Sequence, residues 1–161
     1  MRSDDLNRLA KTVLARCRAK GWTLATAESC TGGLVAAALT DIAGASDVVE
    51  RGFVTYSNRA KSELLGVPAD LIARHGAVSA ETAAAMAQGA LAKAPVDLVV
   101  AVTGIAGPSG GSPDKPVGLV YFGVARRGGK SQTERKIFTG DRAGIRRAAT
   151  VRALELLAAA E

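Results

Sequence analysis

Cysteine and histidine are almost absent from this chain of 161 residues, which contains two cysteines and one histidine. Two cysteines, Cys17 and Cys30, are too few for a disulfide framework. Together with the lone His75 they supply too few sulfur and nitrogen ligands for a zinc site. We therefore expect neither a disulfide-stapled fold nor a bound metal.

Aromatic residues are also scarce, at 4% of the chain, which argues against a nucleic-acid surface built from stacked rings. The formal net charge is +6, but the lysines and arginines are scattered rather than clustered. We expect no nucleic-acid partner. A small phosphorylated substrate would suit a basic surface equally well.

Long hydrophobic runs are missing too, because no stretch of about 18 apolar residues occurs. The N-terminus carries Asp4 and Asp5 and no apolar core of signal-peptide length. We expect a soluble, cytoplasmic protein without a membrane partner. Apolar residues make up 48% of the chain, so residues 1–161 are expected to fold as one domain around one core.

Hydrophobic periodicity predicts alternating helices and strands. The expected helices are 3–20, 34–41, one beginning near 58, 69–75, 79–93 and 139–157, and the expected strands are 22–27, 48–57, 96–103, 119–125 and 132–138. The almost unbroken apolar run 96–103 is typical of a central strand covered on both faces. The last two strands form a late antiparallel hairpin. This pattern predicts the α/β class, as a three-layer α/β/α sandwich with a mixed sheet.

The most distinctive stretch is a strand-to-helix junction that contains Ser29 and Cys30, followed by Thr31, Gly32 and Gly33. The first turn of a helix offers free backbone N–H groups and positive dipole character. The N–H groups of Thr31, Gly32 and Gly33 are therefore candidates to hold a phosphate or a developing oxyanion. This junction is the best active-site candidate in the chain.

Two nucleophiles compete at the junction. A thiolate at Cys30 would be favoured by the helix N-terminus. Adjacent helical residues point about 100° apart, so Ser29 and Cys30 cannot both face one site. The residues alone leave the choice between them open. Glu28 fits a local structural acceptor better than a general acid.

A serine hydroxyl needs a base. His75 would be the usual partner, but His75-Gly76 is an ordinary helix end. Lys61 is the alternative. Asn58 suits an N-cap, which would put Lys61 in the first turn of a helix, where a cation opposes the dipole. Such a local misfit is typical of a functional site. To act as a base, Lys61 must be neutral near pH 7, which requires desolvation or a nearby cation.

A long Gly/Pro-rich loop, 103–116, leaves the expected central strand and is well placed to line a ligand site. Its candidate binding residues are Thr103, Gly104 and Gly107. Arg142, near the start of the last helix, is either solvated or aimed at an anion. No dinucleotide fingerprint is present, and a P-loop would need glycine at Val124.

Four landmarks together resemble the C-terminal domain of CinA, the competence/damage-inducible protein family. They are Ala27-Glu28-Ser29-Cys30-Thr31-Gly32-Gly33, Tyr56-Ser57-Asn58-Arg59-Ala60-Lys61, the loop from Thr103 to Gly111 with Lys115-Pro116-Val117-Gly118, and Gly140-Asp141-Arg142. They occur in order at natural spacing from about residue 5 onward. No counterpart of the N-terminal domain of full-length CinA proteins is recognised, so we expect the stand-alone form.

The resemblance implies a nicotinamide-nucleotide amidase of pyridine nucleotide recycling, which hydrolyses nicotinamide mononucleotide to nicotinate mononucleotide and ammonia without a cofactor. It implies Ser29 as nucleophile, Lys61 as catalytic lysine and Tyr56 as an assisting residue that orients Lys61 or relays a proton. It is also compatible with a homodimer. Two rivals stay open: a non-catalytic nucleotide- or partner-binding module linked to competence or DNA damage, and an amidase of another small carboxamide.

Overall fold

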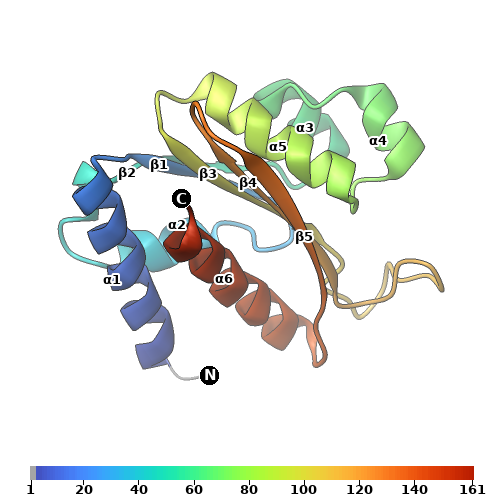
Figure 1. Cartoon of the computed structure of the whole chain (residues 1–161). Coiled ribbons are helices and arrows are strands. Elements are labelled where there is room, and N and C mark those ends of the chain that lie inside the picture. The colour runs from blue at the N-terminus through green and yellow to red at the C-terminus, as the bar shows by residue number, and fades with distance from the viewer. Residues whose placement is uncertain (1–2) are drawn as a thin grey trace.

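The computed structural model describes residues 3–161 and contains a five-stranded sheet with helices on both faces (Figure 1). The strands are β1 (Leu24–Glu28), β2 (Val49–Val54), β3 (Leu98–Gly104), β4 (Leu119–Arg126) and β5 (Ser131–Ile137). Their order in the sheet is β2-β1-β3-β4-β5. The first three are parallel, whereas β4 is antiparallel to both β3 and β5. The predicted mixed sheet and late hairpin are confirmed.

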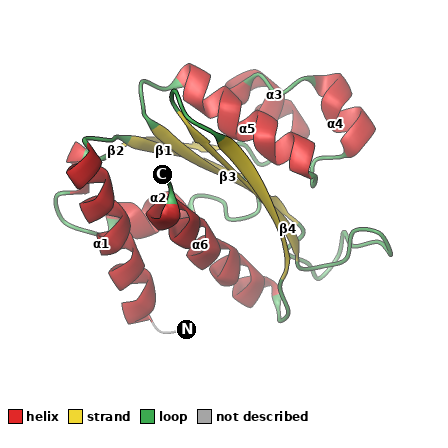
Figure 2. Ribbon diagram, in the orientation of Figure 1, coloured by secondary structure: helices red, strands yellow, loops and turns green. Residues whose placement is uncertain are grey.

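The helices form the two outer layers (Figure 2). One layer consists of α1 (Ser3–Lys20), α2 (Leu34–Thr40) and α6 (Arg142–Ala159), with the short 3-10 helix η1 (Ala45–Asp47) beside α2. The other consists of α3 (Asn58–Leu65), α4 (Ala69–His75) and α5 (Ala80–Lys93). The three-layer α/β/α sandwich predicted from the alternating pattern is therefore confirmed. Among these helices of residues 3–161, none has the length and apolar composition needed to cross a membrane.

Strand β3 lies in the middle of the sheet, and its alternating side chains supply both cores. Leu98, Val100 and Val102 are fully buried against the layer of α1, α2 and α6. Val99 and Ala101 are fully buried against the layer of α5. An almost unbroken apolar run is what such a two-sided strand requires, because both faces leave water.

Two local predictions need correction. The strand predicted over 48–57 ends at Val54. The cap of the following helix is Ser57 rather than Asn58, because the Ser57 hydroxyl accepts the N–H of Ala60 at 3.0 Å. Both residues are favourable caps, so propensity alone could not separate them. Lys61 still lies in the first helical turn.

The carboxyl ends of the three parallel strands lie side by side. Glu28 at the end of β1 pairs with Val54 of β2 and with Val102 of β3. The segments that follow these strands therefore emerge at one edge of the sheet, the usual place for a ligand site in α/β folds. Ser29 is the first residue beyond β1.

The carboxylate of Glu28 caps helix α2 from inside the protein. Gly33, the residue before the helix, provides no side-chain cap and has a left-handed backbone with φ 102°. The fully buried Glu28 instead accepts five hydrogen bonds. Their donors are the hydroxyls of Thr26 and Thr31 and the N–H groups of Gly33, Val35 and Ala36. These contacts satisfy the otherwise unpaired amides of the helix, so Glu28 is the structural acceptor that the sequence indicated.

Replacing Glu28 by glutamine should destabilise the fold by about 2–3 kcal/mol, because the amide turns one acceptor into a donor facing other donors and removes the charge. Urea unfolding at pH 7 measures the change. Glu63→Gln is the matched control, since Glu63 is exposed and pairs only with Arg59 on its own helix; its effect should stay within about 0.5 kcal/mol. Equal losses in the two variants would contradict the capping role of Glu28.

Candidate active site

Ser29 and Lys61 meet at the edge of the sheet, although 32 residues separate them in the chain. The N–H of Ser29 donates to the carbonyl of Val102 at 2.9 Å, which anchors the start of the turn to β3. Lys61 reaches the turn from α3. Its Nζ lies 3.1 Å from the Oγ of Ser29, within the range in which a base can take a proton.

The amine of Lys61 is buried among uncharged acceptors. The residue is 1% exposed, and its Nζ also contacts the carbonyl oxygens of Thr55 at 3.2 Å and Tyr56 at 3.3 Å. No carboxylate of residues 3–161 forms an ion pair with Lys61. Burial therefore lowers the pKa of Lys61 below its ordinary value of 10.5.

The three contacts of Lys61 can also be made by a neutral amine. A neutral amine has two N–H groups and one lone pair. The carbonyls of Thr55 and Tyr56 can accept the two N–H groups, which leaves the lone pair directed at the hydroxyl of Ser29. In the structure Nζ donates to the Ser29 Oγ at 3.1 Å, and the Ser29 hydroxyl donates to the Tyr56 carbonyl at 3.5 Å. With a neutral amine the first contact can reverse, so that the Ser29 hydroxyl donates to the lone pair of Lys61, as general-base activation requires.

Cys30 lies in the apolar core between the sheet and helices α1, α2 and α6. Burial raises the pKa of its thiol to about 11. The expectation that the helix N-terminus would favour a Cys30 thiolate is therefore wrong, because desolvation outweighs the dipole and Glu28 already occupies the helix end. The amine of Lys61 is directed at Ser29 instead.

The turn after Ser29 uses most of the groups that sequence reasoning assigned to the substrate. The N–H of Gly32 donates to the carbonyl of Ser29 at 3.0 Å, and the N–H of Gly33 donates to Glu28 at 3.2 Å. Thr31 is fully buried, and its hydroxyl donates to Glu28 at 2.7 Å. The two glycines have positive φ values, 58° and 102°, so the backbone itself requires glycine there.

The backbone N–H groups of Cys30 and Thr31 differ from those of the two glycines. Within residues 3–161, neither donates a hydrogen bond to another residue. Both directly follow the nucleophile candidate, which is where acyl-transfer enzymes place donors for an oxyanion. Of the three amides expected to hold an oxyanion, those of Gly32 and Gly33 are already paired, and that of Thr31 is not.

Arg146 on α6 holds the other side of this turn, and sequence reasoning did not single it out. Its Nε donates to the carbonyl of Cys30 at 3.0 Å and its Nη2 to the carbonyl of Thr31 at 3.1 Å. These contacts join residues more than a hundred positions apart. No local pattern indicates them, because Arg146 looks like an ordinary basic residue of an amphipathic helix.

Tyr56 contributes two groups in different places. Its carbonyl accepts from Lys61, whereas its side chain is 59% exposed and its hydroxyl accepts from the Nη2 of Arg142 at 3.0 Å. The Nη1 of Arg142 donates to the carbonyl of Gly107 at 3.0 Å. Arg142 therefore connects the loop after β3 to Tyr56, close to the lysine.

The loop after β3 presents backbone rather than side chains. The Thr103 hydroxyl is buried and donates to the carbonyl of Ala77 at 2.8 Å, so it serves the fold. At Gly104 and Gly107 an added Cβ would collide with valine side chains of the neighbouring segment. A cavity of about 690 Å³ lies between residues 106–108 and the start of α6, and Arg142 and Arg146 line it, whereas Ser29 and Lys61 do not.

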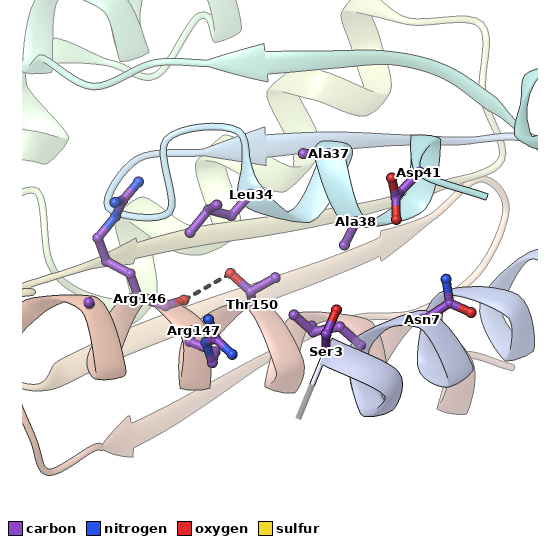
Figure 3. A pocket seen from close by; sticks show the side chains of 11 residues that line it. Ser3, Asn7, Leu34, Ala37, Ala38, Asp41, Arg146, Arg147 and Thr150 are labelled. Atoms are coloured by element: carbon purple, nitrogen blue, oxygen red, sulfur yellow. Dashed lines mark hydrogen bonds between the residues drawn. The ribbon is translucent and has the colours of Figure 1, made fainter. Parts of the chain in front are cut away.

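A second cavity of about 430 Å³ lies between α1, α2 and α6 (Figure 3). Neither Ser29 nor Lys61 lines it, so it is separate from the amine–hydroxyl pair. Arg146 borders this cavity as well as the one beside Arg142. Nowhere in residues 3–161 do three His, Cys, Asp or Glu side chains group closely enough to hold a metal ion.

Substituting Lys61 by methionine should flatten the pH dependence of stability. Unfolded Lys61 keeps its proton up to about pH 10.5, whereas the folded residue loses it at lower pH. The unfolded state thus binds more protons in this window, and the free energy of unfolding rises with pH. Denaturant unfolding between pH 7 and 10.5 should show a steeper rise for the wild type than for Lys61→Met. Lys93→Met, at an exposed position, should keep the wild-type slope; a steeper slope in Lys61→Met would contradict a lowered pKa.

Comparison with known proteins shows the family of this chain. The family model of the CinA C-terminal domain matches residues 6–160. The nicotinamide-nucleotide amidohydrolase PncC of Escherichia coli K12 is 50% identical over 98% of this chain and 95% of its own length. A CinA-like protein of Geobacter sulfurreducens is 56% identical over 91% of this chain and 35% of its own length. The crystal structure of the competence/damage inducible protein CihA from Agrobacterium tumefaciens, 48% identical, superposes with a TM-score of 0.93 over 95% of this chain and 93% of that protein. The chain belongs to the CinA C-terminal domain family.

Proposed function

We propose that this chain is a nicotinamide-nucleotide amidohydrolase, which hydrolyses the carboxamide of nicotinamide mononucleotide to nicotinate mononucleotide and ammonia. The observation that carries the proposal is the 3.1 Å contact between the Ser29 hydroxyl and a buried lysine without a carboxylate partner among the described residues. The proposal also rests on the 50% identity to a relative named for this activity.

In the proposed acylation step, the neutral amine of Lys61 takes the proton of Ser29 as Oγ attacks the carboxamide carbon. The carbonyl oxygen becomes an oxyanion that the N–H groups of Cys30 and Thr31 stabilise, each donor contributing about 3 kcal/mol. Protonated Lys61 then gives its proton to the departing nitrogen. Ammonia leaves, and a nicotinoyl ester on Ser29 remains.

In the proposed second step, water attacks the ester of Ser29 and Lys61 takes a proton from that water. The carbon–oxygen bond to Ser29 breaks, the serine regains its proton from Lys61, and the nicotinate product is released. Each step returns Lys61 to the neutral state that its burial favours. One buried amine can therefore serve both halves of the reaction.

The substrate phosphate suits the cavity beside Arg142. Arg142 holds two neutral oxygens, the carbonyl of Gly107 and the hydroxyl of Tyr56, so its positive charge is available to an anion. The cavity of about 690 Å³ is within the range of small-molecule sites. With the phosphate bound there, the carbonyl of Tyr56 orients Lys61 and its hydroxyl orients Arg142.

A nucleotide- or partner-binding module without catalysis is the rival function, and two relatives are named as putative competence-damage inducible proteins. A binding module would not need a lysine buried against a serine hydroxyl, because burial disfavours the charged form of the amine that would bind an anion. Another small carboxamide would use the same chemistry, and a substrate panel separates that alternative.

Ser29→Ala should lower kcat for ammonia release from nicotinamide mononucleotide at least about 1000-fold, because the other groups of the site cannot form an acyl-enzyme. A coupled ammonia assay at saturating substrate measures kcat. Ser131→Ala, on the edge strand β5, is the matched control and should keep wild-type kcat. Full turnover by Ser29→Ala, together with its loss in Cys30→Ala, would move the nucleophile to the thiol.

Tyr56→Phe should raise KM for the nucleotide about 3–10-fold and change kcat less than about 3-fold. The substitution removes one hydrogen bond to Arg142 but keeps the carbonyl that contacts Lys61. Steady-state kinetics measures both constants, with Tyr121→Phe on β4 as the control. A 100-fold fall in kcat at unchanged KM would instead make the hydroxyl the proton donor to the leaving ammonia.

A further inference from the structure

Arg146 of α6 hydrogen-bonds the turn that carries the nucleophile candidate. Figure 3 shows it extending from α6 toward the segment that precedes α2, while Arg147 lies lower in the view, beside the cavity between α1, α2 and α6. Its guanidinium donates to the consecutive carbonyls of Cys30 and Thr31. A planar guanidinium holds two acceptors in fixed relative positions, which a lysine cannot do.

The hydrogen bond from Arg146 to the Cys30 carbonyl determines the direction of the Thr31 N–H. A trans peptide is planar, and its C=O and N–H groups point in opposite directions. Because the Cys30 carbonyl faces Arg146, the Thr31 N–H of the same peptide faces away from α6. That N–H is one of the two amides of the turn without an acceptor in residues 3–161.

The next peptide is held at both ends. The Thr31 carbonyl accepts from the N–H of Leu34 at 3.0 Å as well as from Arg146, and the Gly32 N–H donates to the Ser29 carbonyl. A Cβ at Gly32 would lie 3.1 Å from the Nη2 of Arg146. The glycine thus leaves room for the guanidinium, which fills the inner side of the turn.

Arg146 also keeps its positive charge free of acidic partners. Among the side chains of residues 3–161, no carboxylate forms an ion pair with it. A cation that hydrogen-bonds a carbonyl polarises that peptide and makes its N–H a stronger donor. The charge therefore acts on the Cys30–Thr31 peptide rather than on a neighbouring carboxylate.

We propose that Arg146 is a positioning residue that pre-orients the Cys30–Thr31 peptide, so that its N–H group is aimed at the oxyanion before substrate binds. The inference rests on the proposed amidase function and deepens it. Arg146 itself contacts only the backbone, and its effect reaches the reaction through the peptide it holds. Misplacement of a catalytic group by about 1 Å can lower a rate about 100-fold.

Arg146→Ala should lower kcat for ammonia release about 100-fold and change KM less than about 3-fold, because the oriented amide acts on the transition state. Adding millimolar guanidinium should restore part of that kcat. Arg146→Lys should lie between the two, since one ammonium reaches one carbonyl. Arg152→Ala is the matched control: Arg152 lies on the same helix and pairs with Glu134 and Glu155, so its loss should lower stability without lowering kcat.

A loss of kcat in Arg146→Ala no larger than that in Arg152→Ala would overturn the inference, as would a change confined to KM. Labelling of Ser29 by a fluorophosphonate, followed by mass spectrometry, separates this outcome from failure of the proposed function. If the wild type releases no ammonia but is labelled, the substrate proposal fails while slower labelling of Arg146→Ala still supports the positioning role. A wild type that is neither active nor labelled would overturn both.

Discussion

The site depends on a lysine amine that is kept out of water beside a serine hydroxyl. Lys61 is 1% exposed, and within residues 3–161 its nitrogen hydrogen-bonds a hydroxyl and two backbone carbonyls. Burying an ammonium group without a carboxylate is costly, so the fold favours the neutral amine. Burial makes the charged form of Lys61 less favourable, and the same burial makes the amine a better proton acceptor.

The rest of the structure serves to hold that pair. Parallel pairing of β1 with β2 and β3 places the ends of the three strands together. Glu28 satisfies the first amides of α2 from inside, whereas those of Cys30 and Thr31 donate to no other residue of 3–161. The nucleophile turn is thus fixed by an internal carboxylate on one side and by Arg146 on the other.

Much of the fold could be predicted from the sequence, because it follows from local patterns. The apolar run of β3 and the alternation of helices with strands indicated the central strand and the three layers. The lack of a well-placed histidine and the family resemblance pointed to Ser29 and Lys61, whose reactive atoms the structure places 3.1 Å apart.

The remaining features of the site are contacts between distant segments. Arg146 meets the turn, and Arg142 meets Tyr56, only after α6 packs against the sheet. Sequence reasoning also assumed that the N-terminal amides of α2 were free for substrate. It indicated Glu28 as a local structural acceptor, but not that its carboxylate would accept from the first amides of α2.

The ionisation of Lys61 is the most direct test of this account. A pH titration of side-chain resonances in lysine-labelled protein, with Lys61 assigned by its loss in Lys61→Met, measures the pKa of the amine itself. The account predicts a pKa for Lys61 below its ordinary value of 10.5. A Lys61 resonance that titrates at or above 10.5 would show a charged amine beside Ser29 and would contradict the central claim.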